Sequence, residues 1–342
     1  MNRFQNPPRP RNILRTGLDH CYDPDGIQIS CPETGQDPDL NIGIAWPEPR
    51  FTILNRELVQ DELTGLCWTR KANFFDFPLT WNQALDEIKT MNRQAFRGFT
   101  DWRMPNRREM RSLISHGHKK PALPGDHPFI QVFLAWYWTS TTSAKAVAYA
   151  WHVHLEGGRM FYGRKDQRYL VWPVRGTPTH IPKTGQNSCF DHLGKIISCP
   201  GTGQDPDWNC GEAWPEPRFF RKENEVFDHL TNLIWYDPGA LINRPLNWAG
   251  ALNLVQDMKG THLWRLPNIN ELESLIDASE HSPALPLSHP FTGLNDGYWS
   301  STSSFFEPDW SYVLYLNKGA VGVGFKARPE FYVWPVRDID QK

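Results

Sequence analysis

Residues 101–114 read DWRMPNRREMRSLI, and residues 263–276 read LWRLPNINELESLI. In both stretches a proline keeps the residue before it out of helical geometry, and the asparagine that follows is a favourable helix N-cap. A glutamate three residues later completes a capping box, and the next apolar residues have helical spacing. Each stretch therefore predicts an extended segment that runs into a helix. We expect its tryptophan in the core and its arginine on a carbonyl or carboxylate partner.

The rest of the chain is also written twice. Three further motifs recur: TGQDPD at 34–39 and 202–207, AWPEPRF at 45–51 and 213–219, and VWPVR at 171–175 and 333–337. Duplication on this scale indicates tandem repeats, and 342 residues are enough for two domains. We divide the chain into an N-terminal tail (1–15), a first repeat (16–176), a linker rich in Thr and Pro (177–183) and a second repeat (184–342).

Both repeats are predicted to contain the same elements. A hairpin opens each repeat, and a strand, two helices, an irregular stretch and three closing strands follow it. In the first repeat the closing strands are expected at 137–141, 151–155 and 169–175. The opening hairpin has too few apolar residues to fold alone, so we expect it to lie against its own domain. The predicted fold class is α+β.

Charge is distributed unevenly between the repeats. Residues 1–176 hold 23 Lys and Arg against 18 Asp and Glu, a net of +5, whereas residues 177–342 hold 13 against 20, a net of −7. One interpretation is that solvated surface residues have drifted between the two copies. The other is that the repeats face different partners or each other. The overall net charge of −2 disfavours nucleic-acid binding.

The six cysteines bear on the compartment. Two pairs, each ten residues apart, flank the predicted hairpins, so disulfides are feasible there: Cys21–Cys31 and Cys189–Cys199. This duplication favours an oxidising compartment over free thiols, and Cys67 and Cys210 are expected to be buried as small hydrophobic residues. No apolar run is long enough to span a membrane. Residues 1–15 show no signal peptide, which leaves a cytosolic chain, a removed leader or leaderless export open. From the cysteine pairs we expect an extracellular or surface location, with the periplasm also open.

Several motifs together carry a resemblance to a known family. They are LTGLCW at 63–68, DWRMPNRRE at 101–109, YWTST at 137–141 and the PVR at 173–175, each with a counterpart in the second repeat. The set resembles the Legionella collagen-like protein C-terminal domain family over nearly the whole chain. The resemblance implies two tandem C-type lectin-like domains, each with two helices, a small twisted antiparallel sheet and a long loop region that carries binding. The family's named member is similar to a surface adhesin that binds sulfated glycosaminoglycans.

Basic residues of the first repeat are the best candidates for an anion site. If they converge, they form a groove suited to sulfate or carboxylate groups. The second repeat has Ile269, Asn270 and Glu273 at equivalent positions, so any such site belongs to the first. The alternative is an ordinary solvated helix and hairpin. The candidates are Arg107, Arg108, Arg111, Lys119, Lys120, Arg159, Arg164, Lys165 and Arg168.

Aromatic and acidic loop residues offer two further candidate sites. Rings near polar groups suit sugar stacking or a protein interface, although they equally suit core filling. The aromatic candidates are Tyr149, Tyr162, Phe305, Phe306 and Trp310. Paired carboxylates at Pro-fixed turns could hold calcium, the one cofactor that the sequence leaves open, although turn chemistry explains them too. These are Asp37, Asp39, Asp205 and Asp207.

No catalytic signature stands out. The His-x-His pair at 152–154 could ligate zinc on a strand, but it does not recur in the second repeat. An enzyme of the formylglycine-generating type would need reactive cysteines late in the domain, and none follows Cys210. We therefore expect a non-enzymatic secreted or surface protein for adhesion and carbohydrate binding, with an anionic glycan or a surface protein as partner. The alternative is an assembly subunit that polymerises through complementary domain surfaces.

Overall fold

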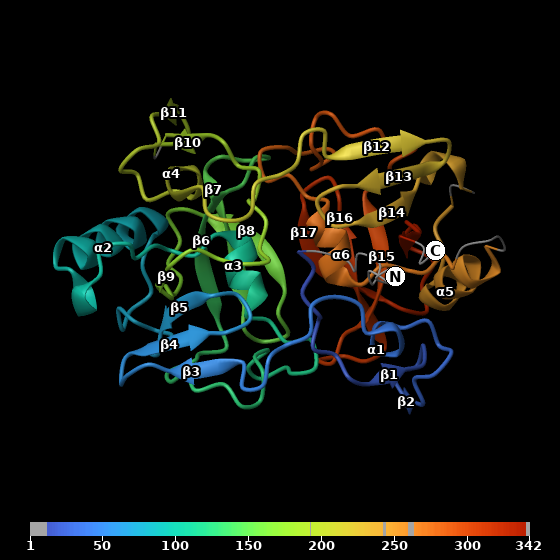
Figure 1. The fold of residues 1–342 in the computed structure, drawn as a ribbon, viewed down its shortest axis with the longest axis horizontal. Helices are drawn as coiled ribbons and strands as arrows, with labels where there is room; N and C mark the ends of the chain where they lie inside the picture. The colour runs from blue at the N-terminus through green and yellow to red at the C-terminus, as the bar shows by residue number, and fades with distance from the viewer. Residues whose placement is uncertain (1–11, 192, 242–243, 259–262, 340–342) are drawn as a thin grey trace, which may run out of the picture.

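A computed structural model describes residues 12–191, 193–241, 244–258 and 263–339. Within these residues the protein is mixed α+β, with mostly small antiparallel sheets and few helices (Figure 1). Apart from the short helices η1 and η2, its elements occur in the same order twice. Residues 1–11 of the predicted N-terminal tail lie outside the described ranges. We call residues 51–176 copy one and residues 219–339 copy two, and the segments before them (12–50 and 181–218) extension one and extension two.

The two copies contain equivalent elements. Copy one holds β3 (Phe51–Ile53), β4 (Leu58–Asp61), β5 (Leu66–Thr69), α2 (Trp81–Arg93), η1 (Phe96–Gly98), α3 (Arg107–Ser112), β6 (Trp136–Thr142), β7 (Tyr149–His154), β8 (Met160–Arg164) and β9 (Val174–Arg175). Copy two holds β12 (Phe219–Lys222), β13 (Glu225–Asp228), β14 (Leu233–Tyr236), η2 (Pro238–Ala240), α5 (Trp248–Asp257), α6 (Ile269–Ser274), β15 (Gly297–Ser303), β16 (Trp310–Tyr315), β17 (Ala320–Phe325) and β18 (Val336–Asp338).

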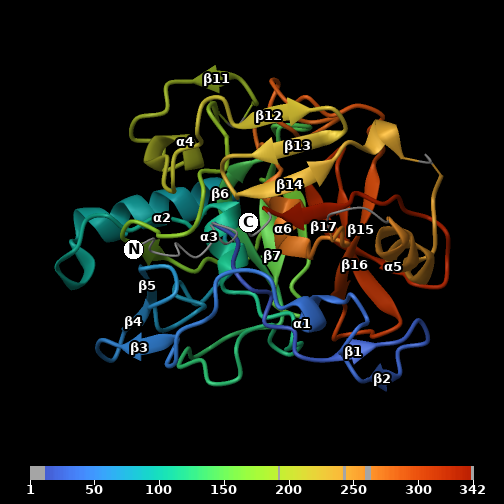
Figure 2. The ribbon, with the colours of Figure 1, turned by 45° about the vertical axis from the view of Figure 1, so that its right-hand side comes forward.

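One sheet runs through both copies. Each copy has its own four-stranded antiparallel sheet, β3-β4-β5-β9 or β12-β13-β14-β18. Six other strands form a continuous sheet in the order β15-β16-β17-β8-β7-β6, and its halves meet where Val321 pairs with Met160. Helices α3 and α6 lie side by side over this join (Figures 1 and 2). The repeats are therefore joined by paired strands and packed helices as well as by the linker.

The duplicated stretch folds as its sequence predicts. The Asn106 side chain accepts the backbone N–H of Glu109, and the Glu109 carboxylate accepts the N–H of Asn106, which completes the capping box. Arg103 makes a buried ion pair with the same Glu109 carboxylate, and copy two repeats both arrangements. Trp102 is fully buried, whereas its counterpart Trp264 is only half-buried and packs edge-on against Tyr236. The tryptophan therefore enters the core in copy one alone.

We expected each opening hairpin to lie against its own domain, and the structure shows that this prediction is wrong. Extension one contains β1 (Cys21–Tyr22), β2 (Gln28–Ile29) and α1 (Asp37–Leu40), and extension two contains β10 (Cys189–Phe190), β11 (Ile196–Ile197) and α4 (Asp205–Trp208). In Figures 1 and 2, α1, β1 and β2 lie beside copy two, and α4, β10 and β11 lie beside copy one. The extensions are exchanged between the copies.

Equivalent side chains hold each exchanged extension. Thr302 of copy two donates to the Asp37 carboxylate at 2.8 Å, and Thr141 of copy one donates to Asp205 at 2.6 Å. The Lys326 ammonium lies 4.1 Å from the Trp248 ring centre and donates to the carbonyl of Asp23 in extension one. Both copies carry the same docking residues, so the repeat pattern alone does not predict which copy an extension packs against.

Both predicted disulfides are confirmed. Cys21–Cys31 and Cys189–Cys199 close the hairpins of the two extensions. Cys67 is buried and Cys210 is half-buried, and both are free thiols. Burial raises the pKa of Cys67, and it raises the pKa of Cys210 to about 11. Neither thiol has the low pKa of a reactive cysteine.

Candidate functional site

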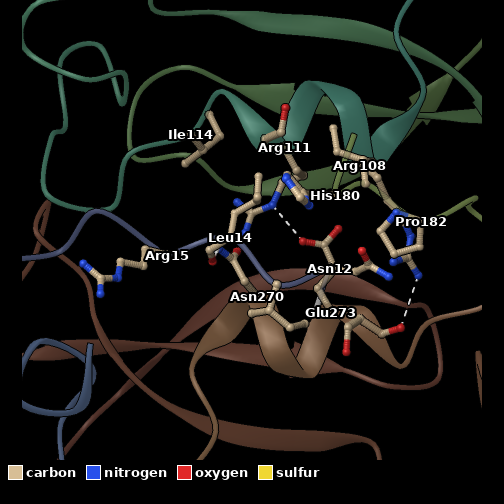
Figure 3. A pocket seen from close by; sticks show the side chains of 14 residues that line it. Asn12, Leu14, Arg15, Arg108, Arg111, Ile114, His180, Pro182, Asn270 and Glu273 are labelled. Atoms are coloured by element: carbon tan, nitrogen blue, oxygen red, sulfur yellow. Dashed lines mark hydrogen bonds and ion pairs between the residues drawn. The ribbon is translucent and has the colours of Figure 1, made fainter. Parts of the chain in front are cut away.

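Three of the predicted anion-binding arginines lie at the join between the copies. Arg107 and Arg111 are 1% and 6% exposed, and they face Glu273 of α6, which is 7% exposed. The Arg111 Nε donates to the Glu273 carboxylate at 3.0 Å, and an Arg107 nitrogen lies 3.6 Å from it. Figure 3 shows Arg111 and Glu273 pointing toward one another. Both line a cavity of about 60 Å³. Arg107 and Arg111 are therefore buried against copy two and do not lie on an exposed groove, although Arg111 lines this small cavity.

Arg108 is also committed to this join. It is half-buried, and it donates to the carbonyls of Ser274 and Ile276 in copy two. Burial lowers the pKa of Arg107 and of Arg108 to about 10, because the protein interior disfavours their charge. Burial opposes the charge of Glu273 as well, but the three arginines together hold its pKa below the usual range. These residues form a structural charge cluster, which we call the join cluster: Arg107, Arg108, Arg111 and Glu273.

Three other predicted cations remain exposed and gather on one face. Lys119 and Lys120 follow α3, and Arg159 lies in the turn between β7 and β8. The Lys119 ammonium lies 5.1 Å from the ring centre of Phe305, and the Lys120 ammonium lies 5.3 Å from that of Phe306. Both rings come from copy two and are half-buried. We call these five residues the basic–aromatic face.

Backbone hydrogen bonds fix the loops that form this face. Gly157 donates to the carbonyl of Lys119 at 3.1 Å, which ties the loop after α3 to the β7–β8 turn. In copy two, the Ser304 N–H donates to the Trp310 carbonyl and the Trp310 N–H donates to the Glu307 carbonyl, both at 2.9 Å, which closes the loop carrying the two phenyl rings. A cleft of about 100 Å³ lies beside Arg159 and Phe306, with Glu156 and Glu307 in its wall. The face is therefore built from both copies, with acidic groups at its edge.

The other three basic candidates do not join this face. Arg164 is exposed and pairs with Asp166 at 2.8 Å. Lys165 is buried, with its ammonium 4.0 Å from the Trp81 ring centre and 2.9 Å from the Thr142 hydroxyl. Burial lowers the pKa of Lys165 to about 7. Arg168 is exposed and lines a separate cavity in copy one.

The remaining aromatic candidates belong to the six-stranded sheet. Tyr149 packs edge-on against Tyr162, and Tyr162 packs against Trp151. Trp310 contacts Phe325 on the neighbouring strand, with ring centres 5.6 Å apart. All three candidates are half-buried. They fill the sheet surface, so only the pair from the β15–β16 loop contributes to the basic–aromatic face.

The acidic candidates serve the extensions. Asp37 and Asp205 each accept hydrogen bonds from two threonine hydroxyls. Asp39 and Asp207 accept backbone N–H groups of Gly35 and Gly203, as turn-forming side chains do. Burial raises the pKa of Asp37 and of Asp205 to about 6. Among the described residues, no three His, Cys, Asp or Glu side chains gather where they could hold a metal ion.

Comparison with known proteins gives a family. No curated protein and no solved structure matches this sequence. Within the described residues, no helix is both long and apolar enough to cross a membrane. The profile of the Lcl C-terminal domain matches residues 57–175 and again residues 224–337, which together make up more than half of the chain. The two matched segments coincide with the copies that share the six-stranded sheet, and the chain thus belongs to the Lcl C-terminal domain family, with two copies of the domain in tandem.

Proposed function

We propose that this protein is a non-enzymatic secreted or cell-surface binding protein, and that the basic–aromatic face holds an anionic glycan. Its family membership fits a surface or binding protein. The observation that carries the proposal is the convergence of Lys119, Lys120 and Arg159 with two half-buried phenyl rings on one face. All three cations are exposed, unlike the join cluster, and among the described residues the lysines contact copy two through the two phenyl rings.

The chemistry of the face suits a sulfated or carboxylated polysaccharide. Lysine and arginine bind sulfate and carboxylate groups through charge-assisted hydrogen bonds. Phe305 and Phe306 offer apolar surface for the C–H faces of sugar rings, and they already hold the lysine ammonium groups nearby. Glu156 pairs with Lys120 at 3.2 Å, so a bound anion would compete with it for this ammonium, and Glu307 lies in the wall of the same cleft. The predicted ligand is therefore an extended polyanion whose charged groups bind the three cations one after another along its length.

The fold and the compartment support this function. Two helices, a small antiparallel sheet and a long loop region in each copy fit a C-type lectin-like domain, and we propose that assignment for both. The ligand-binding segments proposed here are loops, as in binding proteins built on a rigid scaffold. Two disulfides are typical of proteins that fold in an oxidising, extracellular or periplasmic compartment. Adhesion to an anionic surface polysaccharide would use both the binding loops on a rigid scaffold and the location outside the cytoplasm.

The test is binding to an immobilised sulfated polysaccharide at increasing salt. We expect affinity to fall as salt rises, because a polyanion releases counterions when cations neutralise it. The triple variant Lys119→Ala/Lys120→Ala/Arg159→Ala should bind at least about tenfold more weakly, with a shallower salt dependence. A matched control removes three exposed cations elsewhere: Arg56→Ala/Lys195→Ala/Lys222→Ala.

Two results would count against the proposal. If the control variant loses as much affinity as the triple variant, only the net charge of the chain matters. If the wild type binds independently of salt, or not at all, the face does not hold a polyanion. Circular dichroism and melting temperature of each variant establish that the comparison is made between folded proteins.

A further inference from the structure

Copy one carries a second recess, and none of the join-cluster residues lines it. Its volume is about 480 Å³, which lies within the range of small-molecule sites. It lies between the chain after β5, the loop before β6, the end of β7 and the segment after β8. Aromatic and apolar side chains dominate its wall, and a few polar groups interrupt them. The residues that the argument uses are Asn73, Phe133, Trp136, His154 and Arg168.

The indole of Trp136 is held in a fixed position at this cavity. It stacks on His152, with ring centres 4.0 Å apart and an interplanar angle of 16°. His154 meets it edge-on at 4.7 Å. Burial lowers the pKa of His152 to about 3, so this imidazole is neutral at physiological pH and packs as an uncharged ring. Trp136 is therefore a preorganised apolar surface that needs no rearrangement to receive a ligand.

Asn73 supplies a hydrogen-bond acceptor that the protein itself does not use. Its side chain is 6% exposed, and its Nδ2 donates to the carbonyl of Asp76 at 3.0 Å. Its Oδ1 is buried with no hydrogen-bond partner among the described residues. A buried carbonyl oxygen without a partner is costly. This oxygen has almost no accessible surface, so a ligand hydroxyl would donate to it after the Asn73 side chain turns toward the cavity.

His154 and Arg168 add two donors. The Nδ1 of His154 accepts the N–H of Glu156 at 3.1 Å, which assigns the proton of the neutral ring to Nε2. Burial lowers the pKa of His154, which favours this neutral form. Arg168 is exposed, and its guanidinium makes no ion pair with the described residues. The cavity thus presents an acceptor, a neutral donor and a cation around an aromatic surface, beside the Asp76 carboxylate, which is paired with Lys71.

Copy two lacks this cavity wall at the equivalent positions. Gly297 stands where copy one has Trp136, and Val313 and Tyr315 stand where it has His152 and His154. The ring of Phe331 fills the space, because a Cβ added to Gly297 would lie 2.3 Å from it. The arrangement is therefore specific to copy one and is not a by-product of the shared fold.

We propose that this cavity binds a single acidic sugar residue, a pyranose that carries a carboxylate. The C–H face of the pyranose lies on Trp136, a ring hydroxyl donates to Asn73 Oδ1, and another accepts from His154 Nε2. The carboxylate pairs with Arg168, which distinguishes an acidic sugar from a neutral one. This site is separate from the basic–aromatic face, and it recognises one sugar unit where that face recognises a charged chain.

Titration with methyl glucuronide and methyl glucoside tests the proposal, with calorimetry and saturation-transfer NMR as readouts. For a ligand of this size we expect a dissociation constant on the order of 1 mM for the acidic sugar, with the neutral sugar about tenfold weaker. Trp136→Gly should weaken both sugars about tenfold or more, and copy two shows that the backbone accepts glycine there. Arg168→Ala should bring the acidic sugar down to the affinity of the neutral one.

Controls separate this site from the proposed polyanion face. Arg164→Ala removes an exposed arginine from the same hairpin and should leave sugar binding unchanged. Lys119→Ala/Lys120→Ala/Arg159→Ala should lose polysaccharide binding and keep methyl glucuronide binding, whereas Trp136→Gly should do the reverse. Trp136→Phe keeps an aromatic ring and should retain part of the affinity, which guards against misfolding of the glycine variant.

Three outcomes would overturn the proposal. The first is no binding of either sugar at concentrations well above the expected dissociation constant. The second is binding that Trp136→Gly leaves unchanged. The third is binding of indole carboxylates or apolar peptides in place of the sugars, which would make the cavity a site for an aromatic or peptide ligand.

Discussion

Replacing Glu273 by glutamine tests whether the join cluster holds the two copies together. The carboxylate lies 3.0 Å from Arg111 and 3.6 Å from Arg107, so at an effective dielectric constant near 20 each pair contributes about 5 kcal/mol before desolvation is subtracted. Glutamine keeps the shape of the side chain and leaves the buried guanidinium groups without their carboxylate. Breaking a buried ion pair in this way costs about 3–5 kcal/mol of folding free energy.

The assay is urea unfolding at pH 7, followed by tryptophan fluorescence and circular dichroism. Glu87→Gln on the exposed side of α2 is the control, and it should change the unfolding free energy by less than about 0.5 kcal/mol. A second signature is pH dependence. The pKa of Glu273 is lower in the folded chain than its usual 4.5, so its contribution is fully present above 4.5 and is lost as pH falls through the folded pKa. The gap between wild type and Glu273→Gln should therefore narrow in acid.

One result would refute this reasoning. If Glu273→Gln unfolds within about 1 kcal/mol of the wild type at pH 7, the arginines are stabilised by their carbonyl contacts and the carboxylate is not needed. The measurement decides between these outcomes because the control substitution has the same chemistry at an exposed position.

Three further predictions follow from the disulfides, the buried lysines and the exchanged extensions. Denatured but unreduced protein should show two reactive thiols, Cys67 and Cys210, and reduced protein six in a thiol titration. Burial lowers the pKa of Lys165 and of Lys326 to about 7 from 10.5, so the unfolded chain binds more protons between these values. The unfolding free energy should therefore rise with pH across that window, and Lys165→Met/Lys326→Met should flatten the rise in urea titrations. Thr302→Val should cost about 1–3 kcal/mol and increase hydrogen exchange in extension one but not in extension two.

Local chemistry explains which features of the fold were predictable. The Asn106 and Glu109 capping box involves groups three residues apart, and both copies form it as expected. The Cys21–Cys31 pair spans ten residues across one hairpin, so its spacing was enough to predict the bond. The exchange of extensions was not predictable in this way, because Thr141 and Thr302 occupy equivalent positions and offer the same donor to either carboxylate.

The site residues depended on contacts that are distant in sequence. Arg111 and Glu273 are 162 residues apart, and a basic helix face gives no sign that its partner lies on the same chain. A signal was nevertheless present, since these two residues occupy equivalent positions of the duplicated stretch and have opposite charges. The same comparison of copies would have found the cavity, because Trp136 corresponds to Gly297. Differences between the repeats were more informative about the candidate sites than the shared motifs.

The charge reversal on the two helices also bears on assembly. If two copies of α3 packed in the way that α3 and α6 pack, Arg111 would lie against a second Arg111 in a buried setting. Repulsion between like charges disfavours that arrangement. The charges at the join therefore favour pairing of copy one with copy two over pairing of two identical copies, and one chain provides both. Because these complementary charges are already buried within the chain, polymerisation through them would require the copies to separate first.

The basic–aromatic face depends on the same join, since its lysines come from copy one and its phenyl rings from copy two. Weakening the join cluster should thus weaken polysaccharide binding, even though none of its residues lies on that face.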